Sequence, residues 1–181
     1  MTRYFILTLG LFLGLLLGLW LWLVSANPAP VLQPFSVAIA PSQFLTGRLY
    51  LPADTTAPVP ALLLCHGVNS SKDTLAPLAQ ALARRQIAAV VFDFGGYGQS
   101  YRRPNDLSAN QQDANAVLQW MRQHPQIGAL GVGGHSMGGI TALELAKSNP
   151  ALRTTILLSI IGPATPTLPH NLGWAVAFTK S

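Results

Sequence analysis

The sequence has little charge, and carboxylates are the scarcest charged groups. Only 9% of its 181 residues are charged, and 6 Asp and Glu residues stand against 11 Lys and Arg residues. The net charge of +5 thus reflects a shortage of acids more than a basic patch. The basic doublets Arg84–Arg85 and Arg102–Arg103 lie in no aromatic or lysine-rich run. The composition therefore does not indicate binding to nucleic acid.

Cysteine is nearly absent as well. Cys65 is the only one, which excludes a disulfide within the chain. Because Cys65 ends an apolar run, we interpret it as a small buried residue and not as a nucleophile. Half of the residues are hydrophobic, which excludes a disordered chain.

An uncharged apolar block runs from Tyr4 to Val24, and Arg3 is the only charge before it. A helix of about 20 residues crosses the hydrocarbon core of a membrane. The position of Arg3 favours a cytoplasmic N-terminus and an exported domain. The alternative is a signal peptide cleaved after Val24-Ser25-Ala26, which would leave the domain secreted or periplasmic. We expect residues 1–26 to be a membrane anchor or signal peptide, with residues 4–24 meeting the membrane.

Three prolines, Pro28, Pro30 and Pro34, follow this block. They predict an extended linker over residues 27–34. Residues 35–181 are then enough for one domain with a buried core.

The rest of the chain alternates between strand and helix patterns. Two short β-type runs come first and are expected to pair antiparallel at a sheet edge. Buried apolar runs then alternate with amphipathic segments, which predicts an α/β domain with a mostly parallel sheet and helices on both faces. We expect strands at Phe35–Ala40, Phe44–Leu51, Ala61–Cys65, Ile87–Phe92, Ala129–Val132 and Thr154–Ile161, and helices from Ser71 or Asp73 to about Arg85, Leu107–His124 and Met137–Ser148.

The segment Gly134-His135-Ser136-Met137-Gly138 fits the pattern G-x-S-x-G and lies between a predicted strand and a predicted helix. Small residues two positions either side of the serine let the strand and helix approach closely. The hydroxyl then points out above the carboxyl edge of the sheet, beside the free N–H groups of a helix N-terminus. This context predicts Ser136 as a nucleophile; the alternative is a Gly-rich turn capped by a serine.

The same glycines allow a second interpretation. Gly131-Val132-Gly133 with Ser136 resembles a degraded dinucleotide-binding fingerprint. That motif needs an acid at the end of the next strand, where this sequence has Ile160-Ile161-Gly162. We therefore disfavour a nucleotide site.

His66-Gly67-Val68 follows a predicted buried strand. Hydrolases with a G-x-S-x-G nucleophile supply an oxyanion donor at this place. The backbone N–H groups of Val68 and Met137 could converge on one oxygen atom. We interpret His66 as a turn residue that holds the loop, and a catalytic His66 as the alternative.

Three blocks resemble those of α/β-hydrolases in order and spacing, most of all the serine-aminopeptidase-like and monoacylglycerol-lipase-like branch. They are Cys65-His66-Gly67, Phe92-Asp93-Phe94-Gly95-Gly96-Tyr97-Gly98-Gln99-Ser100 and Gly134-His135-Ser136-Met137-Gly138-Gly139. The resemblance spans about Phe35 to Ile161 and implies an oxyanion hole at Val68 and Met137. It also implies that several residues shape the site: His66, Gly67, Asp93, Gly98, Ser100, Gly134, His135 and Gly138. The second block departs from the branch, which usually has an arginine where this chain has Gly95.

Catalysis by a serine needs a histidine to take its proton and an acid to orient that histidine. In α/β-hydrolases both follow the serine, and here only Glu144 and His170 do. Glu144 is expected on a helix surface, and His170 lies in a proline-rich segment. We therefore expect the acid and the base of the triad to lie beyond Ser181, with His170 as the alternative base. The apolar stretch Leu172–Phe178 has no evident strand partner. These features predict a truncated sequence and a nearly inactive 181-residue chain; a short protein without a triad and a second chain that completes it are the alternatives.

The predicted function is hydrolysis of an ester, thioester or amide through a Ser136 acyl-enzyme. The substrate would be a small molecule, lipid or peptide with an acyl group, and no metal or organic cofactor is implied. The alternative is a membrane-anchored, non-catalytic domain that binds an acyl ligand or a protein partner.

Overall fold

The computed structural model describes residues 12–19, 28–158 and 175–177. Residues 12–19 form a helix with exposed apolar side chains, Leu15 the most exposed at 68%. No helix in these described ranges is both long enough and apolar enough to cross a membrane. Most of the predicted anchor or signal segment, and all of its predicted cleavage site, lies outside the described residues.

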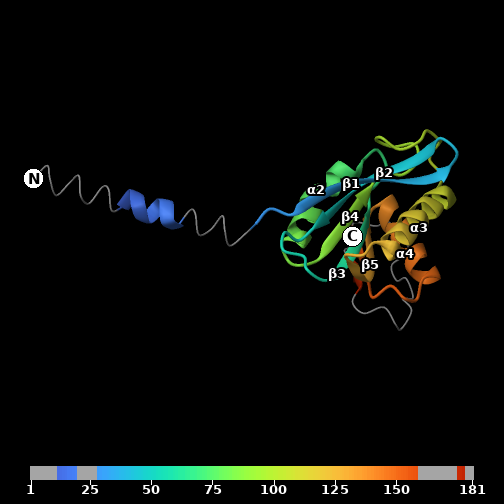
Figure 1. The fold of residues 1–181 in the computed structure, drawn as a ribbon. Coiled ribbons are helices and arrows are strands. Elements are labelled where there is room, and N and C mark those ends of the chain that lie inside the picture. The colour runs from blue at the N-terminus through green and yellow to red at the C-terminus, as the bar shows by residue number, and fades with distance from the viewer. Residues whose placement is uncertain (1–11, 20–27, 159–174, 178–181) are drawn as a thin grey trace, which may run out of the picture.

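One sheet organises the domain, in the strand order β1-β2-β4-β3-β5-β6-β7 (Figure 1). The antiparallel hairpin of β1 and β2 forms one edge and joins β4, and the pairs from β4 to β7 are parallel. This arrangement confirms the predicted fold class. The elements are β1 (Val31–Ala40), β2 (Gln43–Leu51), β3 (Val59–Cys65), α2 (Lys72–Ala83), β4 (Ala88–Phe92), α3 (Leu107–Gln123), β5 (Ile127–His135), α4 (Met137–Ser148), β6 (Thr154–Leu158) and β7 (Ala175–Ala177).

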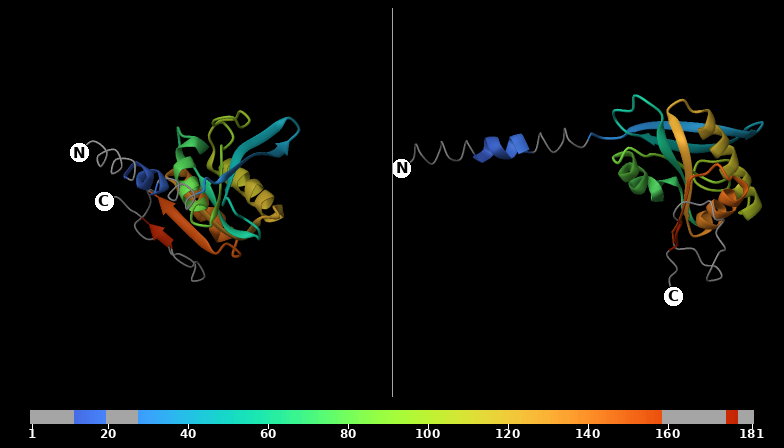
Figure 2. Two further views of the ribbon diagram at one scale, coloured as in Figure 1. Left: turned by 60° about the vertical axis from the view of Figure 1, so that its left-hand side comes forward. Right: turned by 90° about the horizontal axis from the view of Figure 1, so that it is seen from below.

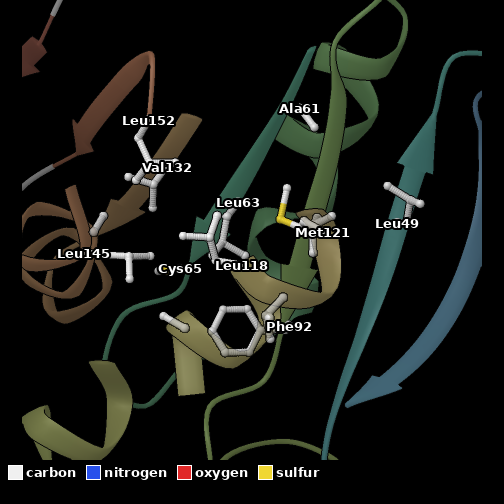
Figure 3. Packing of buried hydrophobic residues seen from close by; sticks show 14 of the residues in the cluster. Leu49, Ala61, Leu63, Cys65, Phe92, Leu118, Met121, Val132, Leu145 and Leu152 are labelled. Atoms are coloured by element: carbon white, nitrogen blue, oxygen red, sulfur yellow. The ribbon is translucent and has the colours of Figure 1, made fainter. Parts of the chain in front are cut away.

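Helices cover both faces of the sheet, α2 on one side and α3 with α4 on the other (Figure 2). Successive residues of β3 point to opposite faces, because side chains alternate along a strand. Leu62 and Leu64 pack in the smaller core with α2. Leu63 and Cys65 belong to the larger core, which Leu118 of α3 and Leu145 of α4 complete (Figure 3). Cys65 is fully buried, and burial raises the pKa of its thiol.

The first strand begins earlier than the sequence predicts. β1 starts at Val31, which pairs with Leu51, so the expected linker over residues 27–34 is too long. Pro34 lies within β1 at the edge of the sheet. An edge strand tolerates proline because an N–H that faces away from the neighbouring strand is not needed for the ladder.

Two further predictions need correction. β5 runs from Ile127 to His135, well beyond Ala129–Val132, because parallel neighbours on both sides extend a glycine-rich segment of low strand propensity. The stretch Leu172–Phe178 does have a partner, since Ala175–Ala177 pairs with β6 as β7.

Candidate active site

The nucleophile candidate lies on a strained turn between β5 and α4. Ser136 has φ 52° and ψ −118°, a backbone conformation that residues other than glycine rarely adopt. Its N–H donates to the Leu158 carbonyl at 3.0 Å, and its own carbonyl accepts from Gly139 and Ile140. The side chain makes no capping hydrogen bond. This conformation confirms the predicted turn and contradicts the alternative of a capping serine.

The flanking glycines explain how this turn is packed. A Cβ on Gly134 would overlap the carbonyl of Gly138, and a Cβ on Gly138 would overlap the carbonyl of Cys65. Only hydrogen fits at either position. Gly131 and Gly133 lie inside β5, paired with both neighbouring strands, and not at a strand-to-helix turn. Their place in the ladder contradicts the dinucleotide-binding interpretation.

The loop after β3 lies against this turn. A Cβ on Gly67 would be 3.0 Å from Nδ1 of His135 and 3.4 Å from the Cβ of Ser136. The next residue, Val68, is half exposed, whereas Met137 is only 6% exposed. The segments that carry the two candidate oxyanion donors thus meet at Ser136.

His66 holds this loop in place. Its Nε2 accepts a hydrogen bond from the Phe94 N–H at 3.2 Å, so Nδ1 carries the proton and donates to the Gly67 carbonyl at 2.7 Å. The ring is fully buried and contacts the rings of Phe94 and Tyr97 edge-on. Burial lowers the pKa of His66, and the bond to Gly67 opposes this only in part. These contacts favour the interpretation of His66 as a turn residue that holds the loop.

A neutral, buried His66 has a consequence for stability at mildly acidic pH. Its pKa is lower in the folded than in the unfolded state, so below about pH 6.5 the unfolded state binds more protons. The free energy of unfolding should therefore fall as the pH drops from about 6.5. The variant His66→Gln does not titrate and should lose part of this fall. Urea unfolding at pH 7.5, 6.5 and 5.5 measures it, and an unchanged pH dependence in the variant would contradict the assignment.

Asp93 interacts with Gly98 and Ser100 in the loop after β4. Asp93 is fully buried and accepts from the Lys72 N–H at 2.8 Å, the Lys72 Nζ at 2.5 Å and the Gln99 N–H at 3.0 Å. Burial alone would raise its pKa, but these hydrogen bonds hold the pKa of Asp93 below its ordinary value. Gly98 has φ 47°, and a Cβ there would overlap the Asp93 carboxylate. Ser100 Oγ donates to the Asp93 carbonyl at 2.6 Å.

Sequence reasoning missed a second polar cluster, around Arg103. Its Nη2 lies 2.5 Å from Oδ2 of Asp113, which also accepts from the Gly95 N–H at 2.9 Å. The space above Gly95 is filled, because a Cβ there would be 2.6 Å from Nε of Arg103 and 2.7 Å from a ring carbon of Tyr101. An arginine from position 103 thus occupies the space beside Gly95, where the branch usually has its motif arginine.

A signal for this cluster was present in the sequence. Asn110 and Asp113 lie on the same buried face of α3 as the apolar residues Ala114, Val117 and Met121. Polar residues in line with an apolar stripe indicate buried hydrogen bonds, because buried polar groups are almost always paired. Lys72 gives a similar signal, since a lysine opening a helix is unfavourable for the helix dipole unless it has an acidic partner.

The described histidines other than His66 do not form a base–acid pair with Ser136. His124 follows the C-terminal end of α3, and His135 is an exposed neighbour of the serine. Glu144 pairs with Lys147 at 2.7 Å on the exposed side of α4, which confirms its interpretation as a surface residue. His170 lies outside the described residues. Within the described part of the chain, no group of three or more His, Cys, Asp and Glu residues could hold a metal ion.

A groove of about 270 Å³ lies between α3 and α4, one helical turn from Ser136. The apolar side chains Leu107 and Ile140 line it and are 52% and 37% exposed. Ile140 also donates its N–H to the Ser136 carbonyl at 3.1 Å. The groove thus combines two exposed apolar side chains with the polar side chains of Ser108, Gln111, Thr141 and Glu144, and Ser136 itself does not line it.

The family model described as serine aminopeptidase, S33, matches residues 56–178, a range that contains the loop after β3, the loop after β4 and the Ser136 turn. The chain belongs to this family. It is an α/β-hydrolase of the branch that its three sequence blocks resemble.

Two curated relatives carry the names of hydrolases. The sn-1-specific diacylglycerol lipase ABHD11 of Mus musculus is 31% identical over 71% of the chain and 41% of its own length. Thiohydrolase aneE of Aspergillus aculeatus is 32% identical over 67% of the chain and 39% of its own length. The chain thus spans less than half the length of these two relatives.

Solved structures agree in fold. The hypothetical protein PA2218 from Pseudomonas aeruginosa has a TM-score of 0.67 at 21% identity, over 73% of this chain and 43% of that one. Est1E from Butyrivibrio proteoclasticus, with ferulic acid bound, has a TM-score of 0.66 at 18% identity, over 70% and 52%. At these identities the similarity concerns the fold alone.

Proposed function

We propose that the protein hydrolyses an ester, thioester or amide through a covalent acyl-enzyme on Ser136. The observation that carries the proposal is the strained Ser136 backbone, with φ 52° between β5 and α4 and a hydroxyl not used for capping. Oγ attacks the acyl carbon of the substrate while a base takes its proton, and the leaving group departs protonated. Water then attacks the acyl carbon of the acyl-enzyme. Hydrolysis of this ester releases the carboxylic acid and regenerates the serine hydroxyl.

The backbone N–H groups of Val68 and Met137 are the proposed oxyanion donors. Met137 is the first residue of α4, where helix geometry leaves the N–H without an intrahelical partner. The contact of Gly67 with the Ser136 turn supports the same role for Val68. Removing one such donor typically costs about 3 kcal/mol of transition-state stabilisation.

The proposed base is a histidine that follows Ser136 in the sequence, and His170 is the one that this chain offers. His66 is committed to Phe94 and Gly67, which argues against it as a base. Glu144 bonds to Lys147, which argues against it as the orienting acid.

The proposed substrate carries an apolar acyl group on a small molecule, lipid or peptide. The exposed apolar side chains of Leu107 and Ile140, which line a groove between α3 and α4, support this class, because apolar surface binds apolar chains. The names of the relatives, a diacylglycerol lipase and a thiohydrolase, agree with an ester or thioester bond.

Membrane attachment through residues 4–24 is part of the proposal. The uncharged run and the exposed apolar side chains of residues 12–19 support it, with the domain on the exported side. Membranes from expressing cells are washed with alkaline carbonate. Retention of the chain supports an anchor, and release of a form that begins near Asn27 shows a cleaved signal peptide and a secreted or periplasmic domain.

The catalytic proposal is tested with a fluorophosphonate probe, which labels an activated serine. The labelled peptide is mapped by mass spectrometry in the full chain and in the variant His170→Ala. Labelling at Ser136 supports the acyl-enzyme, and its loss in His170→Ala identifies the base. Because the sequence predicts a nearly inactive 181-residue chain, the labelling is compared with that of Ser136→Ala. A folded chain that labels no more than this variant, yet binds a fluorescent fatty acid, would overturn the proposal in favour of a non-catalytic binding domain.

A further inference from the structure

The side chain of Met137 is held more firmly than a methionine usually is. Its Sδ accepts from Nδ2 of Asn110 at 3.3 Å and lies 3.9 Å from the hydroxyl of Tyr97. Only 6% of the residue is exposed. Methionine is flexible and its sulfur is a weak acceptor, so two donors directed at one thioether restrict it unusually. This methionine directly follows the nucleophile.

The hydrogen bonds of Asn110 allow only one orientation of its side-chain amide. Oδ1 accepts from Nη2 of Arg103 at 2.7 Å, and a guanidinium has donors only, so the oxygen must face the arginine. Nδ2 therefore faces the other way, toward Oδ1 of Asn105 at 3.1 Å and Sδ of Met137. Asn110 is fully buried, and its bond to Met137 is buried as well, so this contact is shielded from water.

The guanidinium of Arg103 is itself fixed. It pairs with the buried carboxylate of Asp113 at 2.5 Å, and its Nε donates to the Tyr101 hydroxyl at 3.1 Å. Asp113 is one helical turn after Asn110 on α3. A continuous set of buried and partly buried polar contacts thus joins Arg103, in the loop after β4, to Asp113 and Asn110 of α3, and Asn110 to the first residue of α4.

We infer that Asn110 is a positioning residue that holds the Met137 thioether and so aims the Met137 N–H as an oxyanion donor. Arg103 sets the orientation of Asn110. The peptide bond that carries the Met137 N–H directly follows the strained backbone of Ser136. Small backbone rotations there change the direction of this N–H. Pinning the side chain to α3 limits these rotations. The inference rests on the proposed function, since it assigns a role within the same site.

The anchoring is tested without catalysis. The chain has three methionines, so a spectrum of the full chain labelled with 13C at the methionine methyl groups has three signals. The variant Met137→Leu assigns one of them. In Asn110→Leu the 13C chemical shift of the Met137 methyl group should move toward the value of a methionine side chain that rotates freely. The chemical shift of the Met121 methyl group should not change. An unmoved Met137 signal would overturn the inference.

The role in catalysis is tested with a p-nitrophenyl ester, with kcat expressed per active site titrated by the acyl-enzyme burst. Asn110→Leu should lower kcat about tenfold with KM within about twofold, less than the 10²–10³ expected for outright loss of an oxyanion donor. Met137→Leu should match it, and the double variant should be no worse than either, because both remove the same contact. The matched control is Gln112→Leu, an exposed amide on α3.

A merely structural role would lower the melting temperature and the fraction of titratable sites, and leave kcat per titrated site unchanged. That result, or additive losses in the double variant, would overturn the inference. Failure of the proposed function looks different, because Ser136 in the unmodified chain would then give neither burst nor label. The methionine spectrum decides the anchoring in that case.

Discussion

Gly134→Ala is expected to lower the melting temperature by roughly 6–12 °C and to suppress labelling of Ser136. The added methyl group would overlap the backbone carbonyl of Gly138, which cannot move without displacing the first turn of α4. Overpacking of this kind costs typically 1–3 kcal/mol and more where backbone must shift, so about 3 kcal/mol is expected. For a protein of this size each kcal/mol corresponds to about 2–4 °C. Differential scanning calorimetry measures the shift.

Gly128→Ala is the matched control, because it adds the same methyl group to the same strand. A Cβ on Gly128 would be 3.5 Å from the Val59 carbonyl, an ordinary contact. Its effect on the free energy of unfolding should stay within about 0.5 kcal/mol. Equal melting temperatures for Gly134→Ala and Gly128→Ala would show that the close packing at Gly134 is not required.

Ser136→Ala is expected to reduce the hydrolytic rate of the active protein by about 10⁴–10⁶-fold while leaving the fold intact. The nucleophile and its base act as a unit, so removing the serine alone removes the covalent pathway. A residual rate of about 10³–10⁴ over water would come from the oxyanion donors and substrate binding. Because the hydroxyl makes no capping hydrogen bond, the free energy of unfolding should change by less than about 0.5 kcal/mol. Initial rates with an activated ester and urea unfolding give the two quantities.

Ser148→Ala serves as the comparison for this variant. It lies at the other end of α4, where its hydroxyl donates to the Glu144 carbonyl at 2.9 Å. Its rate should equal that of the unmodified protein. If Ser136→Ala retained more than about 1% of the rate, hydrolysis would proceed without an acyl-enzyme on this residue.

The parts of the fold that the sequence predicts best are those in which local pattern and tertiary context agree. Ala61–Cys65 and Ile87–Phe92 are continuously apolar. The structure buries Ala61–Cys65 as part of β3 and Ala88–Phe92 as β4 at the centre of the sheet, so the second prediction begins one residue early. The turn at Ser136 is equally predictable, because its glycine spacing reflects a steric requirement that any sequence at this turn must meet.

Tertiary pairing decides the parts that the sequence does not predict. Pro34 indicates a linker by its own preference, yet the pairing of β1 with β2 makes it a strand residue. The buried roles of Lys72, Asn110 and Arg103 depend on partners 21 residues, 27 residues and 10 residues away in the chain. Composition and periodicity carry no information about such pairings, since they do not say which polar groups meet.

The close approach of Arg103 to Gly95 makes these two positions interdependent in evolution. An arginine introduced at 95 would collide with the guanidinium from 103, and loss of Arg103 alone would leave the buried Asp113 without its cation. Either single change should therefore destabilise the loop after β4. The loop after β4 is therefore held by an arginine eight residues beyond the position at which the branch usually has one.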